Sequence, residues 1–309
     1  MMLLTNYEGR PGVGLARAVL EKGGPALDAV EAGIRAAEED ESVRSVGRGG
    51  TPDILGRMQS DAAIMDGDTL GAGAVGALSG FLHAITVARR VMEKLPHVML
   101  VGDGAARFAR EVRAEPAELL TAKARSAYEA WMEKYVPVEV RAAIDQASLA
   151  EYAWTAGRTL RNKGTVVLLA RDVRGSIAAG ASTSGWANRY PGRLGDSPII
   201  GAGIYADSRF GACGCTHVGE MAIRAGTARS VVLYMKTGMS VQEACQEALR
   251  DIGDLRGGFL GPLVVHAIDV YGNPCVLANE DVGEDMDYFY WREDMAEPER
   301  RRALVIRPD

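Results

Sequence analysis

The feature that most constrains this chain is a short apolar run with a threonine at its head. Thr165 is followed by Val-Val-Leu-Leu-Ala and preceded by Gly164, and a dense polar segment at 183–198 comes soon after. The apolar run predicts a buried strand. Because threonine is common in strands, its position alone indicates only structure.

The glycine before Thr165 makes this threonine a candidate for chemistry. Gly164 is small enough to let the Thr165 hydroxyl approach the Gly164 carbonyl, and the preceding Arg-Asn-Lys at 161–163 is expected to be exposed. Cleavage between Gly164 and Thr165 would give Thr165 a free α-amine beside its own hydroxyl. A nucleophile and its base would then lie on one residue.

Composition excludes several classes of protein. The 309 residues suffice for one large or two medium domains. A net charge of −6 without a basic block argues against a nucleic-acid partner. No apolar stretch reaches the length of a membrane span. Four cysteines do not indicate a disulfide framework and no targeting signal is recognisable, so we expect a cytoplasmic protein.

The first half of the chain mixes helices and short strands. Helices are predicted at 25–38, 83–95, 104–112 and 116–135, and strands at 62–67 and 97–101. Residues 71–80 are small and are expected to let the backbone cross closely beneath another segment. From 136 to 163 the pattern weakens into polar, alanine-rich sequence, either partly helical or disordered, and this segment is the predicted linker.

Strands predominate after Gly164. They are predicted at 165–171, 176–182, 202–206, 209–215, 263–270, 275–278 and 287–291, with two or three helices between 218 and 252 that break near Gly226. Helices grouped between sets of antiparallel strands indicate stacked layers, not a βαβ repeat.

Two opposite charges in the polar segment are candidates for substrate binding. Arg193 and Asp196 lie in Gly-Arg-Leu-Gly-Asp-Ser-Pro, where the glycines allow both side chains to face one pocket. An arginine fork pairs with a carboxylate and an aspartate pairs with an ammonium group, so together they can hold both ends of an amino acid. A local salt bridge that closes a turn is the alternative.

Two further threonines are placed near predicted strand ends. Thr183 ends a strand, where its hydroxyl can meet that of Thr165. Thr216 lies in Gly-Cys-Thr-His-Val-Gly-Glu, which joins a strand to a helix. Backbone N–H groups at such a junction favour anions and, with the Thr216 hydroxyl, can form an oxyanion hole. Helix capping by Thr216, with Glu220 in the first turn complementing the helix dipole, is the alternative, and both roles are compatible.

No metal or cofactor is expected. Cys213, Cys215 and His217 lack a second Cys/His pair at ligand spacing. The glycine-rich loop at 47–53 has neither P-loop nor Rossmann spacing. His83, His97 and His266 lie in apolar, periodic contexts and are interpreted as structural.

Together these segments resemble the plant-type asparaginase and aspartylglucosaminidase family of N-terminal nucleophile hydrolases. The resemblance covers nearly the whole chain outside roughly 113–160. Its motifs fall in family order at 47–53, 64–67, 73–76, 83–102, 164–166, 183–185, 192–203 and 216–220.

The resemblance implies an α+β fold, a four-layer αββα sandwich, made as one intertwined domain. Self-cleavage at Gly164–Thr165 would give an α subunit (1–164) and a β subunit (165–309), assembled as a homodimer of cleaved αβ units. The site residues that it implies are the nucleophile Thr165, Thr183 tuning it, Thr216 in the oxyanion hole, Arg193 and Asp196 gripping the substrate, and Thr51, His217 and Gly219 contacting it.

The chain departs from the family pattern at four places. Thr5-Asn6-Tyr7 stands where a tryptophan is typical of the N-terminal strand in the aspartylglucosaminidase branch. Lys163 stands where members often have histidine, Thr51 where serine is usual, and His217 where glycine is usual, which brings an imidazole to the pocket. The predicted activity is hydrolysis of the side-chain amide of asparagine or, as His217 and Tyr7 favour, of an N4-substituted asparagine such as glycosylasparagine, releasing aspartate. A β-aspartyl peptidase and an uncleaved, non-catalytic binding or assembly protein are the alternatives.

Overall fold

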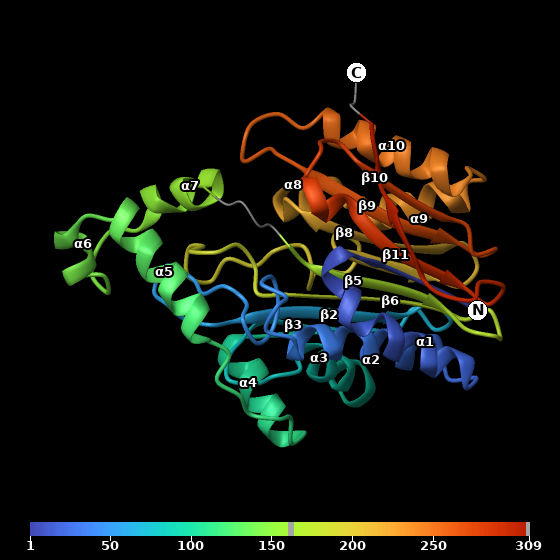
Figure 1. Ribbon diagram of the computed structural model, residues 1–309, viewed down its shortest axis with the longest axis horizontal. Coiled ribbons are helices and arrows are strands. Elements are labelled where there is room, and N and C mark those ends of the chain that lie inside the picture. Colours follow the sequence, from blue (N-terminus) through green and yellow to red (C-terminus); the bar gives the residue numbers. More distant parts are fainter. Residues whose placement is uncertain (160–163, 307–309) are drawn as a thin grey trace.

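Two β-sheets lie face to face between two layers of helices (Figure 1). The computed structural model describes residues 1–159 and 164–306. The larger sheet contains, in spatial order, β12 (Glu299–Arg302), β11 (Asp287–Arg292), β1 (Met2–Asn6), β5 (Val166–Arg171), β6 (Ile177–Thr183), β2 (Ser60–Asp66), β3 (Ala72–Leu78) and β4 (Met99–Val101). The smaller sheet contains β13 (Leu304–Val305), β10 (Pro274–Ala278), β9 (Leu263–Asp269), β8 (Gly211–His217) and β7 (Ile204–Asp207). Neighbouring strands are antiparallel except in the pairs β3–β4 and β10–β13.

Helices cover the outer face of each sheet. The larger sheet is covered by α1 (Val13–Glu21), α2 (Ala26–Glu39), α3 (Ala84–Lys94) and α4 (Gly102–Glu111). The smaller sheet is covered by α8 (Gly219–Ala225), α9 (Thr227–Lys236) and α10 (Val241–Gly253). Short 3-10 turns, η1 (Tyr7–Gly12) and η2 (Gly283–Met286), follow β1 and precede β11. The αββα order of layers implied by the resemblance is confirmed.

Strand β5 is buried on both faces, as its continuous apolar run predicts. Val166 and Leu168 belong to the core beneath the helices of the larger sheet. Val167 and Leu169 belong to the core between the two sheets. Each side chain contributes roughly 1.5–3 kcal/mol of stabilisation relative to exposure, so the strand that follows Thr165 is firmly held.

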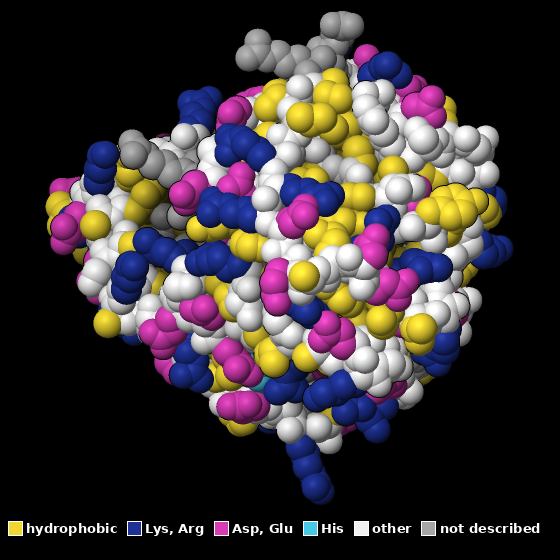
Figure 2. Space-filling model, turned by 45° about the vertical axis from the view of Figure 1, so that its right-hand side comes forward, with side chains coloured by type: hydrophobic (Ala, Val, Ile, Leu, Met, Phe, Trp, Pro, Cys, Tyr) yellow, Lys and Arg dark blue, Asp and Glu magenta, His cyan; other side chains and the backbone are white. Residues whose placement is uncertain are grey.

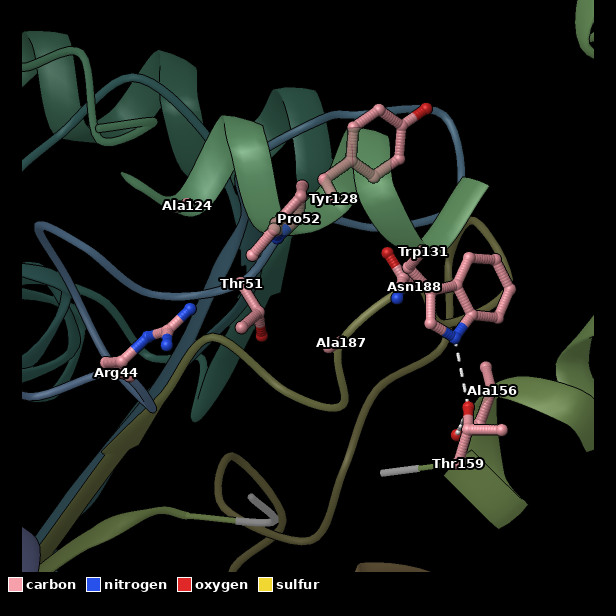
Figure 3. Close-up of a pocket in the computed structure, with 11 residues that line it drawn as sticks. Arg44, Thr51, Pro52, Ala124, Tyr128, Trp131, Ala156, Thr159, Ala187 and Asn188 are labelled. Carbon is pink, nitrogen blue, oxygen red and sulfur yellow. Dashed lines mark hydrogen bonds between the residues drawn. The ribbon is translucent and has the colours of Figure 1, made fainter. Parts of the chain in front are cut away.

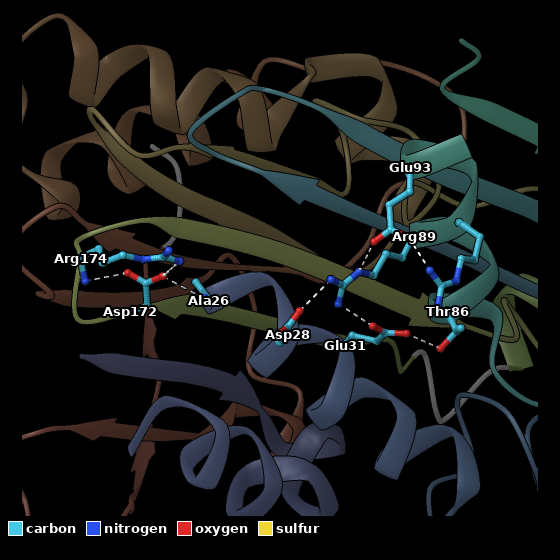
Figure 4. Close-up of polar contacts among 9 residues, drawn as sticks. Ala26, Asp28, Glu31, Thr86, Arg89, Glu93, Asp172 and Arg174 are labelled. Carbon is cyan, nitrogen blue, oxygen red and sulfur yellow. Dashed lines mark hydrogen bonds and ion pairs between the residues drawn. The ribbon is translucent and has the colours of Figure 1, made fainter. Parts of the chain in front are cut away.

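Polar contacts fix α2 across the back of β5 and β6 (Figure 4). Asp172, in the turn between these strands, accepts a hydrogen bond from the Ala26 N–H at the start of α2, at 3.3 Å. Arg89 of α3 pairs with Asp28 and Glu31 of α2, both at 2.7 Å. These ion pairs are partly exposed and contribute about 1 kcal/mol or less each.

A helical projection extends from one end of the layers, at the left of Figure 1. It consists of α5 (Ala122–Tyr135), α6 (Val138–Ala142) and α7 (Ala150–Thr159). Its own small core contains Ile54, Met132, Val136, Leu149 and Tyr152. The predicted linker at 136–163 therefore includes α6 and α7, while residues 160–163 lie outside the described residues.

Several sequence predictions need correction. Within residues 71–80, Ala72–Leu78 form strand β3, which was not predicted and pairs with β2 and β4. The expected close crossing is found, because a Cβ on Gly73 would collide with the backbone of α3 at Ala88. The strand expected to be buried at 97–101 is shorter and is the half-exposed edge strand β4. The helix expected at 116–135 begins only at Ala122, after Pro116 pairs with Phe81. Helix α1 was not predicted, and strand β1 was expected only through the resemblance.

Charges of both signs are interspersed over the face shown in Figure 2. This fits the small net charge of −6. Among the described residues, no helix has the length and apolar character needed to cross a membrane.

Candidate active site

Thr165 lies directly before β5, and its backbone is clamped by the end of β1. The Asn6 side chain donates from Nδ2 to the Thr165 carbonyl oxygen at 2.6 Å and accepts from the Val167 N–H at 2.9 Å. Thr5 donates from Oγ1 to the Val167 carbonyl oxygen at 2.6 Å. These buried bonds fix the position of the candidate nucleophile.

Thr183 contacts the carbonyl group of the predicted cleavage site. Val166 of β5 pairs with Ser182 of β6, so one step further along this register brings Thr165 opposite Thr183. The Thr183 hydroxyl donates to the Gly164 carbonyl oxygen at 3.2 Å and also lies 3.3 Å from the Ser45 carbonyl oxygen. A donor on a carbonyl oxygen stabilises the charge that develops there when a nucleophile attacks.

Gly164 is packed too closely to carry a side chain. A Cβ placed on it would lie 2.5 Å from the Ser45 Cβ. Ser45 in turn donates to Glu8 at 3.0 Å. Burial, followed by the nearby Asp285, raises the pKa of Glu8 above its ordinary value. Only glycine fits at this position without displacement of Ser45.

Arg193 pairs with Glu220 and not with Asp196, so the local salt bridge considered from the sequence is not the arrangement found. Its Nε and Nη2 atoms each donate to Glu220 at 3.0 Å. The guanidinium lies 4.5 Å from the centre of the Trp186 ring, within the range of a cation–π contact. Glu220 and Trp186 therefore hold the arginine in a defined orientation.

Asp196 is a buried carboxylate with an unused oxygen. Its side chain is almost fully enclosed, and Oδ2 has no hydrogen-bond partner within the described part of the chain. Burial raises the pKa of Asp196 to about 7, against the lowering effect of Arg193. Gly219 allows this approach, since a Cβ there would lie 2.5 Å from the Asp196 Oδ1. An unpaired buried carboxylate is suited to receive an ammonium group.

Thr216 ends up between two histidines. Its Oγ1 lies 3.1 Å from Nδ1 of His217 and 3.2 Å from Nε2 of His266. His217 has a left-handed backbone with φ of +86°. This conformation is costly for residues other than glycine, which gives a physical reason for the glycine usual at this position in the resembling family.

A pocket of about 360 Å³ lies between helix α5 and the loops that contain Thr51 and Asn188 (Figure 3). Gly164, Thr165, Arg193 and Asp196 are not among its lining residues. Thr51, Pro52 and Asn188 from loops and Tyr128 and Trp131 of α5 line it. Other lining residues are Arg44, Ala124, Ala127, Ala156, Thr159 and Ala187. The Thr51 N–H donates to Ser184, the residue after Thr183, at 3.0 Å. The volume is within the range of small-molecule sites.

Comparison with known proteins decides the family of this chain. A family model described as asparaginase matches residues 12–284. The chain belongs to the asparaginase family.

Relatives within the asparaginase family carry three kinds of name. An N(4)-(β-N-acetylglucosaminyl)-L-asparaginase of Elizabethkingia miricola is 41% identical over 76% of this chain and 64% of its own length. A plant-type L-asparaginase of Pyrococcus furiosus is 37% identical over 90% of this chain and 87% of its own length. An isoaspartyl peptidase/L-asparaginase of Mus musculus is 35% identical over 82% of this chain and 75% of its own length. This chain thus spans just under two thirds of the Elizabethkingia relative.

Sequence reasoning about this asparaginase-family chain missed several residues of the site. Asn6 was noted only as a departure from the family pattern, although its amide binds the Thr165 backbone. Glu220 was interpreted as a dipole partner of its helix but holds Arg193. His266 was interpreted as structural but contacts Thr216. An asparagine beside the first strand was the only local signal, because the other contacts join distant segments.

Proposed function

We propose that this chain is a self-processing amidohydrolase that cleaves the side-chain amide of an N4-substituted asparagine and releases aspartate. The observation that carries the proposal is the hydrogen bond from Thr183 to the Gly164 carbonyl oxygen, directly before Thr165. The names of the relatives favour an enzyme over a non-catalytic binding protein. A homodimer of cleaved units in the cytoplasm, where four buried free cysteines stay reduced, is part of the proposal.

Self-processing begins when the Thr165 hydroxyl attacks the Gly164 carbonyl carbon. The C–N bond breaks, an ester joins Gly164 to Thr165 Oγ1, and the proton from the hydroxyl ends on the Thr165 amine. Water then hydrolyses the ester, giving a carboxylate on Gly164 and a free hydroxyl and amine on Thr165. The Thr183 hydroxyl supports the oxyanion formed on Gly164.

Turnover uses the freed amine as a base. An ordinary α-amine has a pKa of about 7.7–8.0, near the pH at which general bases work best. It takes the proton from Thr165 Oγ1 while the oxygen attacks the substrate amide carbon. The leaving amine departs with that proton, and water hydrolyses the resulting ester to aspartate. Thr216 supports the oxyanion in both steps.

Arg193 and Asp196 bind the amino-acid end of the substrate in this proposal. Glu220 occupies Nε and Nη2 of Arg193. Nη1 makes no hydrogen bond to any residue that the structure describes, and it can bind the α-carboxylate. The unpaired Oδ2 of Asp196 accepts from the α-ammonium group.

The proposal makes the Michaelis constant depend on the charge of Asp196. Its pKa is about 7 in the free protein, and only the ionised form attracts an ammonium group. Since about one carboxyl in ten is ionised one unit below its pKa, lowering the pH from 8 to 6 is expected to raise KM about tenfold. Steady-state kinetics across this range measure the change. Asp196→Asn should give a high KM that does not vary with pH, whereas a constant wild-type KM would contradict the assignment.

The aromatic pocket is proposed to hold the N4 substituent. Arg44 precedes Ser45, which touches Gly164, and Thr159 lies five residues before Gly164, so the walls come from segments that flank the cleavage site. Tyr128 and Trp131 offer ring faces on which an aryl ring or the apolar face of a sugar can stack. Unsubstituted asparagine would leave this pocket unfilled.

A substrate panel tests the function and the pocket together. Aspartate release is measured from asparagine, glycosylasparagine, an N4-aryl asparagine and a β-aspartyl dipeptide. We expect the ring-bearing substrates to have the highest kcat/KM, and Trp131→Ala to lower it for them about tenfold, consistent with one lost stacking contact. Asparagine should be little affected.

Trp154→Ala is the matched control, because Trp154 is a half-exposed tryptophan of the same helical projection that does not line the pocket. If Trp131→Ala lowered kcat/KM equally for all substrates, the pocket would not be the binding site of the N4 substituent. No aspartate from any substrate would overturn the proposed function.

A further inference from the structure

The hydroxyl of Thr216 lies between two imidazole rings in a closed environment. His266 comes from β9, the strand beside β8, and its Nε2 is 3.2 Å from Thr216 Oγ1. His217 approaches the same oxygen with Nδ1 at 3.1 Å. Thr216, His217 and His266 are all buried. A hydroxyl has one proton to donate and can accept two hydrogen bonds. The direction in which the Thr216 O–H points therefore depends on which histidine nitrogen carries a proton and which is an acceptor.

The surroundings of His266 select one tautomer of its ring. Nδ1 is buried and has no partner among the described residues. A proton on Nδ1 would be a buried N–H without an acceptor, which folded proteins rarely contain. With the proton on Nε2, the ring donates to Thr216 and leaves only an unpaired acceptor. Burial, with a smaller effect of His217, lowers the pKa of His266 to about 3, so the ring stays neutral.

We propose that His266 is a positioning residue that donates from Nε2 to Thr216 and so reserves the Thr216 proton for the substrate oxyanion. The inference rests on the proposed function, in which Thr216 supports that oxyanion. Because the Thr216 hydroxyl accepts a hydrogen bond from His266, it cannot donate its own proton to His266.

In the absence of substrate, His217 accepts the hydrogen bond that the Thr216 hydroxyl donates. Its Nε2 makes no hydrogen bond to any described residue but lies 3.5 Å from a carboxylate oxygen of Asp285. The negative charge of that carboxylate favours a proton on Nε2, which leaves Nδ1 as an acceptor for the Thr216 hydroxyl. A negatively charged oxyanion is a stronger acceptor than a neutral imidazole nitrogen. During the reaction the Thr216 hydroxyl would donate to the substrate oxyanion in place of His217 Nδ1, while it still accepts the hydrogen bond from His266.

A double-mutant cycle tests whether His266 acts through Thr216. His266→Leu removes the donor at similar volume and is expected to lower kcat about tenfold with KM within twofold of wild type, the size of one lost hydrogen bond. Thr216→Val should lower kcat by about 10²–10³. In the Thr216→Val background, His266→Leu should have no further effect, because the hydroxyl that it orients is gone.

His266→Gln is the conservative control, since its amide nitrogen can donate from nearly the same place. It should keep kcat within about threefold of wild type. All rates are measured on asparagine and expressed per cleaved chain. Additive losses in the cycle, an equal loss in His266→Gln and His266→Leu, or a raised KM with unchanged kcat would each overturn the inference.

A second measurement does not depend on activity. Long-range ¹H–¹⁵N spectra report the tautomer of each ring, and the chain has only four histidines, so comparison with His266→Gln identifies the signal. We expect a neutral ring with the proton on Nε2 from pH 5.5 to 8. A proton on Nδ1, or a ring that titrates in this range, would overturn the inference. Failure of the wild type to release aspartate would instead overturn the proposed function, and the spectra would still decide the His266–Thr216 bond.

Discussion

Thr165→Ala is expected to leave the purified chain uncut and to abolish aspartate release. The substitution removes the only atom of this residue that can attack the Gly164 carbonyl, so no free α-amine forms at position 165. Nucleophile and base are lost together, and removal of a nucleophile typically costs 10⁴-fold or more in kcat. The buried bonds from Asn6 reach the backbone of Thr165 and not its hydroxyl, so they survive the change.

Intact-mass spectrometry measures the first effect. The wild type should give two fragments, with threonine at the start of the second, whose masses sum to the chain plus one water. Thr227→Ala is a matched control, because Thr227 is a buried threonine at the start of α9, outside the candidate site. Thr165→Ser should retain both reactions. If Thr165→Ala still released aspartate, the nucleophile would have to be another residue.

Thr183→Val is expected to slow self-cleavage by about 10²–10³ without changing the fold. Valine keeps the shape of the side chain but removes the donor that lies 3.2 Å from the Gly164 carbonyl oxygen. Loss of one such donor has an effect of this size on the formation of an oxyanion. The fraction of cut chain is followed over time after purification.

Thr183→Ser keeps the hydroxyl and should process at close to the wild-type rate. Thermal unfolding of the uncut proteins checks that the loss of the hydrogen bond from the Gly185 N–H to Thr183 does not disturb the loop. Processing of Thr183→Val at the wild-type rate would show that the contact with Gly164 has no catalytic value.

The layered fold followed from the sequence because hydrophobic patterning is local. The run after Thr165 alternates between two cores, and Gly226 separates α8 from α9, as their patterns predicted. Strand β3, within residues 71–80, was missed because alanine and glycine carry little strand preference. Their conformation is set by hydrogen bonds to β2 and β4, which lie elsewhere in the chain.

The candidate site was predicted only in part, because only some of its contacts follow from local sequence and strand register. Thr165, Thr183 and Gly164 were predicted as neighbours, and the structure brings them together. The pairing of Arg193 with Glu220 and the contact of His266 with Thr216 join segments 27 and 50 residues apart. Long-range contacts between polar side chains have no periodic signature, so a single sequence does not reveal them.

The position of β1 has a consequence for how the protein must be made. This strand precedes Gly164, yet it lies between β5 and β11, which both follow it. A cut at Gly164 would therefore leave two chains woven through one sheet, unable to part without unfolding. Assembly of the sheet is a first-order process in the uncut chain, whereas reassembly after cutting needs two molecules to meet and depends on concentration. The uncut chain would fold and refold by itself. The cut protein, once unfolded, would refold readily only if its two fragments met again.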